Sequence, residues 1–468
     1  MLYNKGVILK NIMKKVESNQ KSANIMIAVL LAAVFLIFLG VSFNESITLV
    51  ISGILLGVIL VAIKPEIVVY IMALALPLIN LNIYSGSFII PVIDLIAIIG
   101  LLGFSLHVLS NRNRFLSLQF PFFIPFIIFW FATLVSSLVS PHQLNSLWYS
   151  IRWILLFYLA YVFLPVNIIK SKAVLKNTLI AFIFSGIAMA VMGVVSLKDQ
   201  NFLYEPVRFT ILSFNDISPF GLDQNLLVEV LLPSVFFLLA LLACASKETG
   251  KKLITLCIIF LLFVLIGTFS RGAWISLFIF LGIYLWQNNR VNAKKIVVFG
   301  ALSLVVLIPI FFYMFQLQTA FDVGVGSTRT RLLSSQIAWE NFTESPWLGK
   351  GTGEYVNLIN DSIRFRAQHG EGTDSNGIIQ KLIAENGLFG LISYAFLSIY
   401  IFRQLYSQIA KETKDRIFLL SITLAAFSIF LFEFFNTSYY HGKMWFPIGV
   451  AWAAQLILAK KNNYEETS

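Results

Sequence analysis

The residues best suited to chemistry lie in one polar interval, from about Gly326 to Gly390, within an otherwise apolar sequence. Its side chains that could bind phosphate or move protons are Arg329, Arg331, Arg364, Arg366, His369, Glu371 and Asp374. Guanidinium groups stay charged and form paired hydrogen bonds to phosphate oxygens, whereas carboxylates and imidazoles accept protons. A polar connection of this length is usually functional. The interval therefore predicts an active-site loop that combines phosphate binding with proton transfer.

The composition around this interval is that of a polytopic membrane protein. Of the 468 residues, 58% are hydrophobic and only 12% are charged, and the mean hydropathy is +0.83. Soluble domains carry roughly a quarter charged residues. The net charge of +11 would also suit nucleic-acid binding, but the positions of the basic residues favour cytoplasmic loops instead. Cys244 and Cys257 lack metal-ligand spacing, and we assign them no role.

Apolar stretches of suitable length predict an all-α bundle of about 12–14 transmembrane helices. The predicted spans are residues 24–43, 47–63, 66–80, 89–109, 119–139, 145–164, 176–196, 224–246, 252–269, 272–287, 295–316, 378–402, 416–435 and 443–459. Between 252–269 and 272–287 only Ser-Arg-Gly separates two apolar runs, so this division is the least secure.

The distribution of charge predicts which side of the membrane each loop occupies. With the N-terminus inside, most of the 34 Lys and Arg residues fall on inner segments. The predicted order is a cytoplasmic interfacial segment (1–23), transmembrane helices (24–317), an extracytoplasmic catalytic loop (318–377), further transmembrane helices (378–459) and a cytoplasmic tail (460–468). ATP and nucleotide sugars are absent outside the cytoplasm. Chemistry on the loop therefore needs an activated substrate delivered by the membrane.

Two further polar clusters fall on the same predicted outer face. One is the 197–225 loop, which contains Arg208, and the other is Ser-Arg-Gly-Ala-Trp at 270–274. A charge at membrane depth is costly unless it faces a cavity or a partner, so Arg271 is a functional candidate. An interfacial arginine reaching the headgroups is the alternative. Arg208, Arg271 and Arg331 together could hold a diphosphate, and we predict no metal and no cofactor.

The residues that open the next span have two interpretations. Asp374 or Ser375 can cap the helix that follows. Alternatively, the Asp374 carboxylate orients or deprotonates an acceptor hydroxyl, with His369 and Glu371 as rival bases. For Arg364 a solvated loop surface is the favoured explanation. Asp94, Arg152, Glu229, Glu433 and Lys443 lie near the outer ends of their spans. Interhelical ion pairing is the simpler explanation for Asp94 with Arg152, whereas for Glu433 and Lys443 the choice between a structural and a functional role stays open.

Three stretches resemble the O-antigen ligase and O-antigen polymerase superfamily of bacterial envelope glycosyltransferases. The Arg-Gly pair at Arg271 resembles a short motif between two spans. Arg331 is followed about fifteen residues later by Pro-x-x-Gly-x-Gly, at residues 346–351. Ser-Asn-Gly, from Ser375, resembles the element that re-enters the membrane, and Asn376, Gln380, Glu385, Gly387 and Gly390 occupy matching places. Together with Gln224 and the start of its span, the resemblance covers roughly residues 205–400.

The resemblance implies transfer of a glycan from undecaprenyl diphosphate to a hydroxyl acceptor at the outer leaflet of the bacterial cytoplasmic membrane. It implies diphosphate binding by Arg271 and Arg331, and supporting roles for Asn376, Gln380 and Glu385. The partners it implies are the lipid-linked glycan and membrane lipid, with a chain-length regulator and a flippase as further candidates, and no nucleic acid.

Two departures from the family pattern bear on the reaction type. Ligases typically carry His immediately before the re-entry Asn, where this chain has Ser375, and many members have Trp where this chain has Ser335. The missing His favours polymerisation of lipid-linked repeat units of O-antigen, capsule or exopolysaccharide. Ligation to lipid A–core or another acceptor is the alternative within this class. A lipid-linked glycan flippase or exporter is the alternative from a different class.

Overall fold

The computed structural model describes residues 45–85, 88–110, 117–199, 208–212, 218–221, 223–288, 323–372, 374, 377–411, 415–436 and 442–466. The predicted spans 24–43 and 295–316, the interfacial segment 1–23, and Ser375 and Asn376 lie outside the described residues. The chain divides into two compact units, Met1–Met72 with Leu81–Gln119, and Ala73–Asn80 with Phe120–Ser468.

The first unit is built on a pair of helices. Its elements are α2 (Glu45–Ile63), most of α3 (Glu66–Ala75), β1 (Asn82–Ser85), β2 (Phe88–Pro91) and α4 (Val92–Ser110). The strands form an antiparallel hairpin in which Asn82 pairs with Pro91. Helices α2 and α4 pack closely because Gly103 has no side chain: a Cβ there would lie 2.5 Å from Cβ of Val61. Nδ1 of His107 lies 2.7 Å from the carbonyl oxygen of Ala62 and adds a polar contact to this packing.

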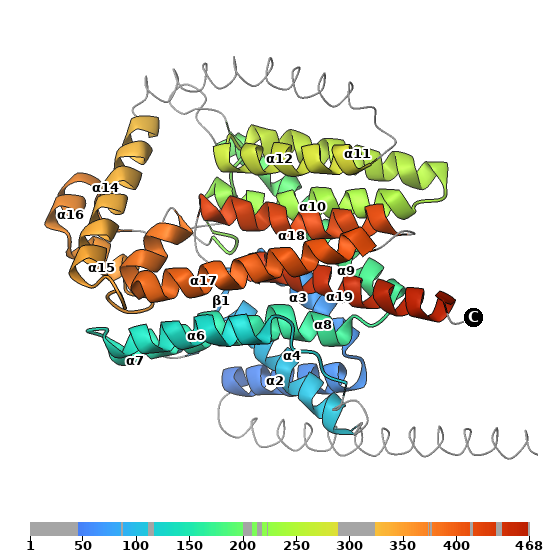
Figure 1. Cartoon of the computed structure of the whole chain (residues 1–468), viewed down its shortest axis with the longest axis horizontal. Helices are drawn as coiled ribbons and strands as arrows, with labels where there is room; N and C mark the ends of the chain where they lie inside the picture. The colour runs from blue at the N-terminus through green and yellow to red at the C-terminus, as the bar shows by residue number, and fades with distance from the viewer. Residues whose placement is uncertain are drawn as a thin grey trace, which may run out of the picture. The chain divides into compact units, whose positions relative to one another are not determined.

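The second unit is a larger helical assembly centred on α10 and α18 (Figure 1). Its helices outside the polar interval are α6 (Phe123–Leu138), α7 (Gln143–Tyr149), α8 (Leu164–Ile168), α9 (Lys172–Val195), α10 (Gln224–Cys244), α11 (Glu248–Gly267), α12 (Arg271–Gln287), α17 (Ile378–Lys411), α18 (Arg416–Phe434) and α19 (Gly442–Glu466). Two π-helical segments, η1 (Ser150–Leu156) and η2 (Leu159–Phe163), join α7 to α8, and a 3-10 turn, η3 (Ser196–Asp199), follows α9. Most of α10 and α18 is buried by neighbouring helices, whereas α11 is largely exposed.

Within the second unit the polar interval folds into three helices of its own. These are α14 (Val323–Glu344), α15 (Tyr355–Asp361) and α16 (Ile363–His369), which gather at the start of α17 (Figure 1). They enclose a small core of Leu333, Ile337, Ala338, Tyr355, Ile359, Phe365 and Ala384. Since Ala384 belongs to α17, this core attaches the three helices to α17.

The predicted class, an all-α polytopic membrane protein, is confirmed, with the β1–β2 hairpin as a small addition. Within the described residues, seven helices are long and apolar enough to cross a membrane. The seven are Val92–Ser110, Gln143–Ile168, Lys172–Lys198, Gln224–Cys244, Glu248–Gly267, Ile378–Ile409 and Arg416–Phe434. The insecure division is resolved into two helices, since α11 ends at Gly267 and α12 begins at Arg271.

Three predicted spans differ from the observed helices for local reasons. The interval 66–80 is helical only to Ala75, because Pro77 disfavours helical backbone in the residue before it. In the interval 89–109 the first residues form strand β2 and the helix begins at Val92. In the interval 378–402 the helix is interrupted at Gly387, whose φ of 58° and ψ of −156° are not helical.

Candidate active site

The break between α11 and α12 places Arg271 at the start of a helix. After Gly267, Phe269 adopts a left-handed conformation with φ of 54°, which turns the chain back on itself. Ser270 then fixes the turn, because its hydroxyl donates to Oδ1 of Asn225 at 2.9 Å. Arg271 itself is exposed. The predicted functional break is therefore a defined turn anchored to the beginning of α10.

Arg208 reaches the same turn along a different part of the chain. The backbone N–H of Phe209 donates to the carbonyl of Gly267 at 2.9 Å, and that of Thr210 donates to the hydroxyl of Ser196 at 3.2 Å. Gly267 permits this approach, since a Cβ there would lie 2.3 Å from the Phe209 ring. The backbone of Arg208 is thus held next to the turn that precedes Arg271.

Arg331, on α14, completes a cluster that we call the arginine site: Asp223, Arg271 and Arg331. A role for Arg208 stays a prediction. Nε of Arg331 is buried and has no hydrogen-bond partner among the described residues. Burial lowers the pKa of Arg331, and the positive charge of Arg271 lowers it further, whereas Asp223 acts in the opposite direction. The cation is therefore desolvated next to a like charge, an arrangement that favours binding of an anion.

Asp223 has a structural task in addition to its charge. Its carboxylate accepts from the backbone N–H of Asn225 at 2.9 Å and from the Asn225 amide at 3.2 Å, so it caps α10. The same Asn225 holds Ser270. The carboxylate that partly offsets the charge of Arg331 is therefore fixed by the residue that anchors the Arg271 turn.

A second cluster surrounds a buried lysine, and we call it the lysine site: Tyr149, Asp374, Lys381 and Glu385. Nζ of Lys381 donates to Oδ1 of Asp374 at 2.7 Å and to the hydroxyl of Tyr149 at 3.0 Å. Oε1 of Glu385 lies 3.8 Å away, one helical turn along α17. The Lys381 side chain is 2% exposed and that of Asp374 is 31% exposed. The Asp374 carboxylate is thus paired with a buried cation while part of its side chain stays exposed.

The Pro-x-x-Gly-x-Gly segment docks on α17 through four backbone hydrogen bonds. The N–H groups of Lys350 and Gly351 donate to the carbonyls of Ala384 and Glu385, each at 2.9 Å. In return, the N–H groups of Leu388 and Phe389 donate to the carbonyls of Pro346 and Trp347, at 2.8 and 3.1 Å. Breaking α17 at Gly387 exposes the donors and acceptors that this exchange uses.

Two glycines make this backbone contact possible. Gly349 has φ of 70°, and a Cβ there would lie 2.4 Å from the carbonyl carbon and oxygen of Glu385. Gly387 has φ of 58°, and its added Cβ would lie 2.6 Å from the Trp347 carbonyl. Both positions therefore require the conformation and the small size of glycine.

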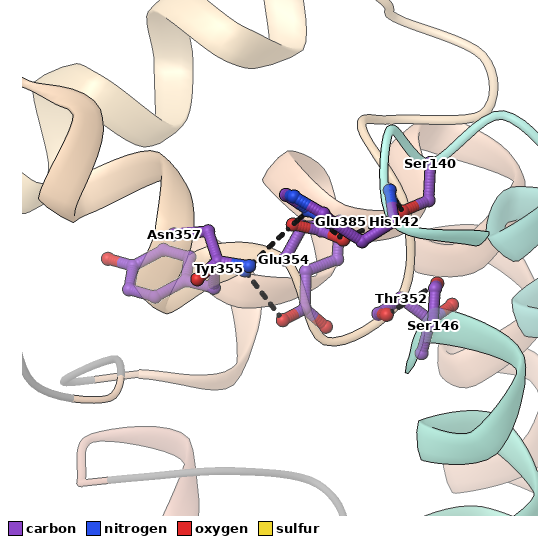
Figure 2. A network of polar contacts seen from close by, with 8 residues as sticks. All are labelled: Ser140, His142, Ser146, Thr352, Glu354, Tyr355, Asn357 and Glu385. Carbon is purple, nitrogen blue, oxygen red and sulfur yellow. Dashed lines mark hydrogen bonds and ion pairs between the residues drawn. The ribbon is translucent and has the colours of Figure 1, made fainter. Parts of the chain in front are cut away.

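A network around Glu354 ties the same segment to α7 (Figure 2). Oε1 of Glu354 accepts from the Ser140 hydroxyl at 2.7 Å, and Nδ1 of His142 lies 3.2 Å from both carboxylate oxygens. Oε2 accepts from the Asn357 amide at 2.8 Å. Burial raises the pKa of Glu354, but the hydrogen bonds from Asn357, Ser140 and His142, with the charge of His142, outweigh it and leave a lowered pKa.

Three more contacts connect this network to the lysine site. Oε1 of Glu385 accepts from the backbone N–H of Tyr355 at 3.2 Å (Figure 2). The Ser146 hydroxyl donates to the Thr352 carbonyl at 2.6 Å, and the Ser136 hydroxyl donates to the Glu385 carbonyl at 2.6 Å. Tyr149 of α7 and Lys381 of α17 are therefore held in register by the segment between them.

The remaining predicted site residues lie on α14, α16, α17 and the segment that follows α16. Nδ1 of His369 contacts the Thr330 hydroxyl at 3.2 Å on α14, and Glu371 is exposed. Gln380 donates to the hydroxyl of Ser335, which in turn donates to the Arg331 carbonyl. Gln380 thereby links α17 to the helix that carries Arg331. The roles of these residues stay predictions, and Asn376 lies outside the described residues.

Sequence reasoning missed Lys381 and Glu354. Lys381 stands within an apolar run, four residues before Glu385, and this spacing is that of a helical ion pair. Glu354 follows directly on the glycine-rich segment. Since a charged residue in an apolar helix is rarely idle, the spacing of Lys381 and Glu385 was the available signal.

The helices and these clusters together define a class: a multi-pass helical membrane protein in which an arginine site and a paired carboxylate lie on the elements around the polar interval. Residues 256–395 match the family model described as O-antigen ligase. This finding confirms the resemblance to the O-antigen ligase and polymerase superfamily, and it supports glycan transfer of that type by a membrane glycosyltransferase-like enzyme. The matched residues include Arg271, Arg331, Asp374 and Glu385 but not Arg208. No curated protein matches the chain.

Proposed function

We propose that the protein polymerises oligosaccharide repeat units carried on undecaprenyl diphosphate at the outer leaflet of the bacterial cytoplasmic membrane. The acceptor hydroxyl oxygen attacks the anomeric carbon of the donor glycan. The bond between that carbon and the diphosphate oxygen breaks, and its electron pair leaves with undecaprenyl diphosphate. The hydroxyl proton passes to a carboxylate. The growing chain then remains attached to the acceptor's own lipid diphosphate.

The observation that carries the proposal is the pairing of Arg331 with Arg271. Two guanidinium groups near one another repel unless an anion lies between them, and a buried Nε without a partner loses its solvation. A diphosphate supplies several oxygens and two or more negative charges, which match two planar cations. Stabilising the departing diphosphate lowers the barrier to glycan transfer, because negative charge develops there in the transition state.

Asp374 is the carboxylate proposed to receive the proton of the acceptor hydroxyl. Its carboxylate is ion-paired with Lys381 and remains partly exposed, so it can receive a proton while staying fixed in place. Gln380 and Ser335 join the start of α17 to the Arg331 backbone, and this link supports a common site for donor and acceptor. The charge distribution of the loops favours placing that site outside the cytoplasm, with both termini inside.

Polymerisation is preferred to ligation because Ser375 stands where ligases typically carry His. The test uses purified protein in proteoliposomes with the lipid-linked repeat unit and no other protein. Wild type is expected to form a ladder of longer lipid-linked glycans, and Arg271→Ala is expected to lose it. Arg364→Ala is the matched control, since Arg364 is an exposed arginine on α16.

Two other outcomes would overturn the proposal. Transfer only after lipid A–core is added would identify a ligase. Movement of an unchanged substrate across the bilayer, with the glycan still attached to its carrier, would identify a flippase.

A further inference from the structure

Lys381 occupies an unusual position for a lysine, inside the packed start of α17. Its side chain is 2% exposed, and Nζ is surrounded by Asp374, Tyr149 and Glu385. It also lies over the Tyr149 ring, 5.4 Å from the ring centroid. These partners come from three places in the chain: the end of α7, the residue that precedes α17 by four positions, and α17 itself.

Stability alone does not account for such a lysine. Desolvating an ammonium and a carboxylate costs several kcal/mol, and apolar residues of similar volume often stabilise a protein as well as a buried ion pair does. The neighbouring positions of α17, Leu382 and Ala384, are already apolar and fully buried. A cation kept among them is better explained by the group that it holds.

We infer that Lys381 is the positioning residue of the acceptor side, holding the Asp374 carboxylate ionised and oriented for the incoming hydroxyl. The inference rests on the proposed function. Among the residues that the structure describes, the groups that face Asp374 or its cation include Lys381 and Glu385 on α17, Tyr149 on α7 and Tyr355 on α15. Of these, Lys381 is the cation, so its ammonium is what favours the ionised carboxylate.

The same contact makes the carboxylate depend on the position of α7. The Tyr149 hydroxyl accepts from Nζ of Lys381, and Tyr149 is the last residue before the π-helical segment η1. Ring atoms of Tyr149 also pack against Gly353, where a Cβ would lie 2.7 Å from them. Tyr149, which is itself packed against Gly353, therefore helps to hold Lys381 in its contact with Asp374.

The experiment measures the pH dependence of ladder formation in proteoliposomes for wild type, Lys381→Met and Lys381→Arg. Removing the ammonium favours the protonated carboxylate, so we expect Lys381→Met to move the acidic limb of the rate profile up by about 1 pH unit or more. The maximal rate should fall about 10-fold or more, with the apparent KM for the donor unchanged. Lys381→Arg keeps the charge and should keep the acidic limb at its wild-type position.

Two controls make the result decisive. Lys350→Met removes a lysine that is paired with the exposed Glu344, and it should leave the profile unchanged. Lys381→Gln keeps hydrogen-bonding capacity without the charge and replaces Lys381→Met if that variant does not fold. An acidic limb that stays in place in the neutral variants would overturn the inference while leaving polymerisation intact. Absence of any ladder in wild type would overturn the proposed function instead.

Discussion

Arg271 and Arg331 lie close enough for the charge of Arg271 to lower the pKa of Arg331, although they belong to helices that are far apart in the sequence. The folded protein thus keeps two cations together without a described partner for Nε of Arg331. Such an arrangement opposes stability and is retained at sites where charge is needed for binding.

The first prediction therefore separates activity from stability. Arg331→Gln should lower the rate of glycan transfer by about 100-fold or more, because a cation near the leaving group is lost. Its melting temperature in detergent should equal or exceed that of wild type, because the repulsion from Arg271 is removed. The exposed Arg364→Gln should change neither quantity. A large loss of melting temperature in Arg331→Gln would show that the residue is structural.

The second prediction concerns the backbone docking of the glycine-rich segment. Gly349→Ala should destabilise the protein by about 3 kcal/mol or more, because the added Cβ meets the Glu385 carbonyl in addition to the strain of a positive φ. Gly370 also has a positive φ, 76°, but an added Cβ has open space around it. Gly370→Ala should therefore cost less, about 1–2 kcal/mol, from the backbone conformation alone. Denaturant unfolding in detergent measures both, and equal costs would contradict the docking argument.

The third prediction follows from the lowered pKa of Glu354. A carboxylate with a lowered folded-state pKa contributes stability above its ordinary value of 4.5, and this contribution disappears as the pH falls through the lowered value. Glu354→Gln should lose about 1 kcal/mol near pH 7. The gap in melting temperature between wild type and variant should narrow below about pH 4.5. Glu344→Gln, which removes an exposed carboxylate, is the matched control, and a gap that persists in acid would contradict the assignment.

The fourth prediction tests the buried ion pair in the helical core. Nζ of Lys443 lies 2.9 Å from Oε2 of Glu229, and the Asn436 amide donates to Oε1 at 3.2 Å. Lys443→Met alone should cost about 3–5 kcal/mol, because it leaves an uncompensated carboxylate in a buried position. The double variant Glu229→Gln with Lys443→Met should recover most of that loss. Failure of the double variant to recover, measured by thermal unfolding, would show that the pair is not the source of the cost.

Much of the helical framework could be predicted from apolar length and from local breaks. Ser-Arg-Gly at 270 proved to be a real helix end, and the long polar interval proved to be a separate group of elements. The fold of the polar interval itself could not be predicted. Its sequence reads as a loop, yet Leu333, Ile337, Tyr355 and Phe365 pack into a core that exists only once Ala384 of α17 supplies one wall.

The charged residues of the candidate site could be predicted where they lie in polar stretches of the sequence. Their partners within apolar spans could not. Arg271 and Arg331 were visible as cations near apolar spans, and both reach the arginine site. Asp374 was visible, but Lys381 was taken as part of an apolar span, although its Nζ lies 2.7 Å from that carboxylate. Pairing across α7 and α17 depends on tertiary packing, which spacing in the sequence does not reveal.

The glycine-mediated docking at residues 346–351 has a consequence for engineering. Because the contact with α17 consists of main-chain groups and two glycines, it does not depend on the identity of the intervening side chains. The helices α15 and α16 follow directly after it and present most of their charged side chains to the exterior. A chimera that exchanges residues 355–369 would therefore keep the main-chain docking, provided that Tyr355, Ile359 and Phe365 are retained to pack against Ala384 of α17.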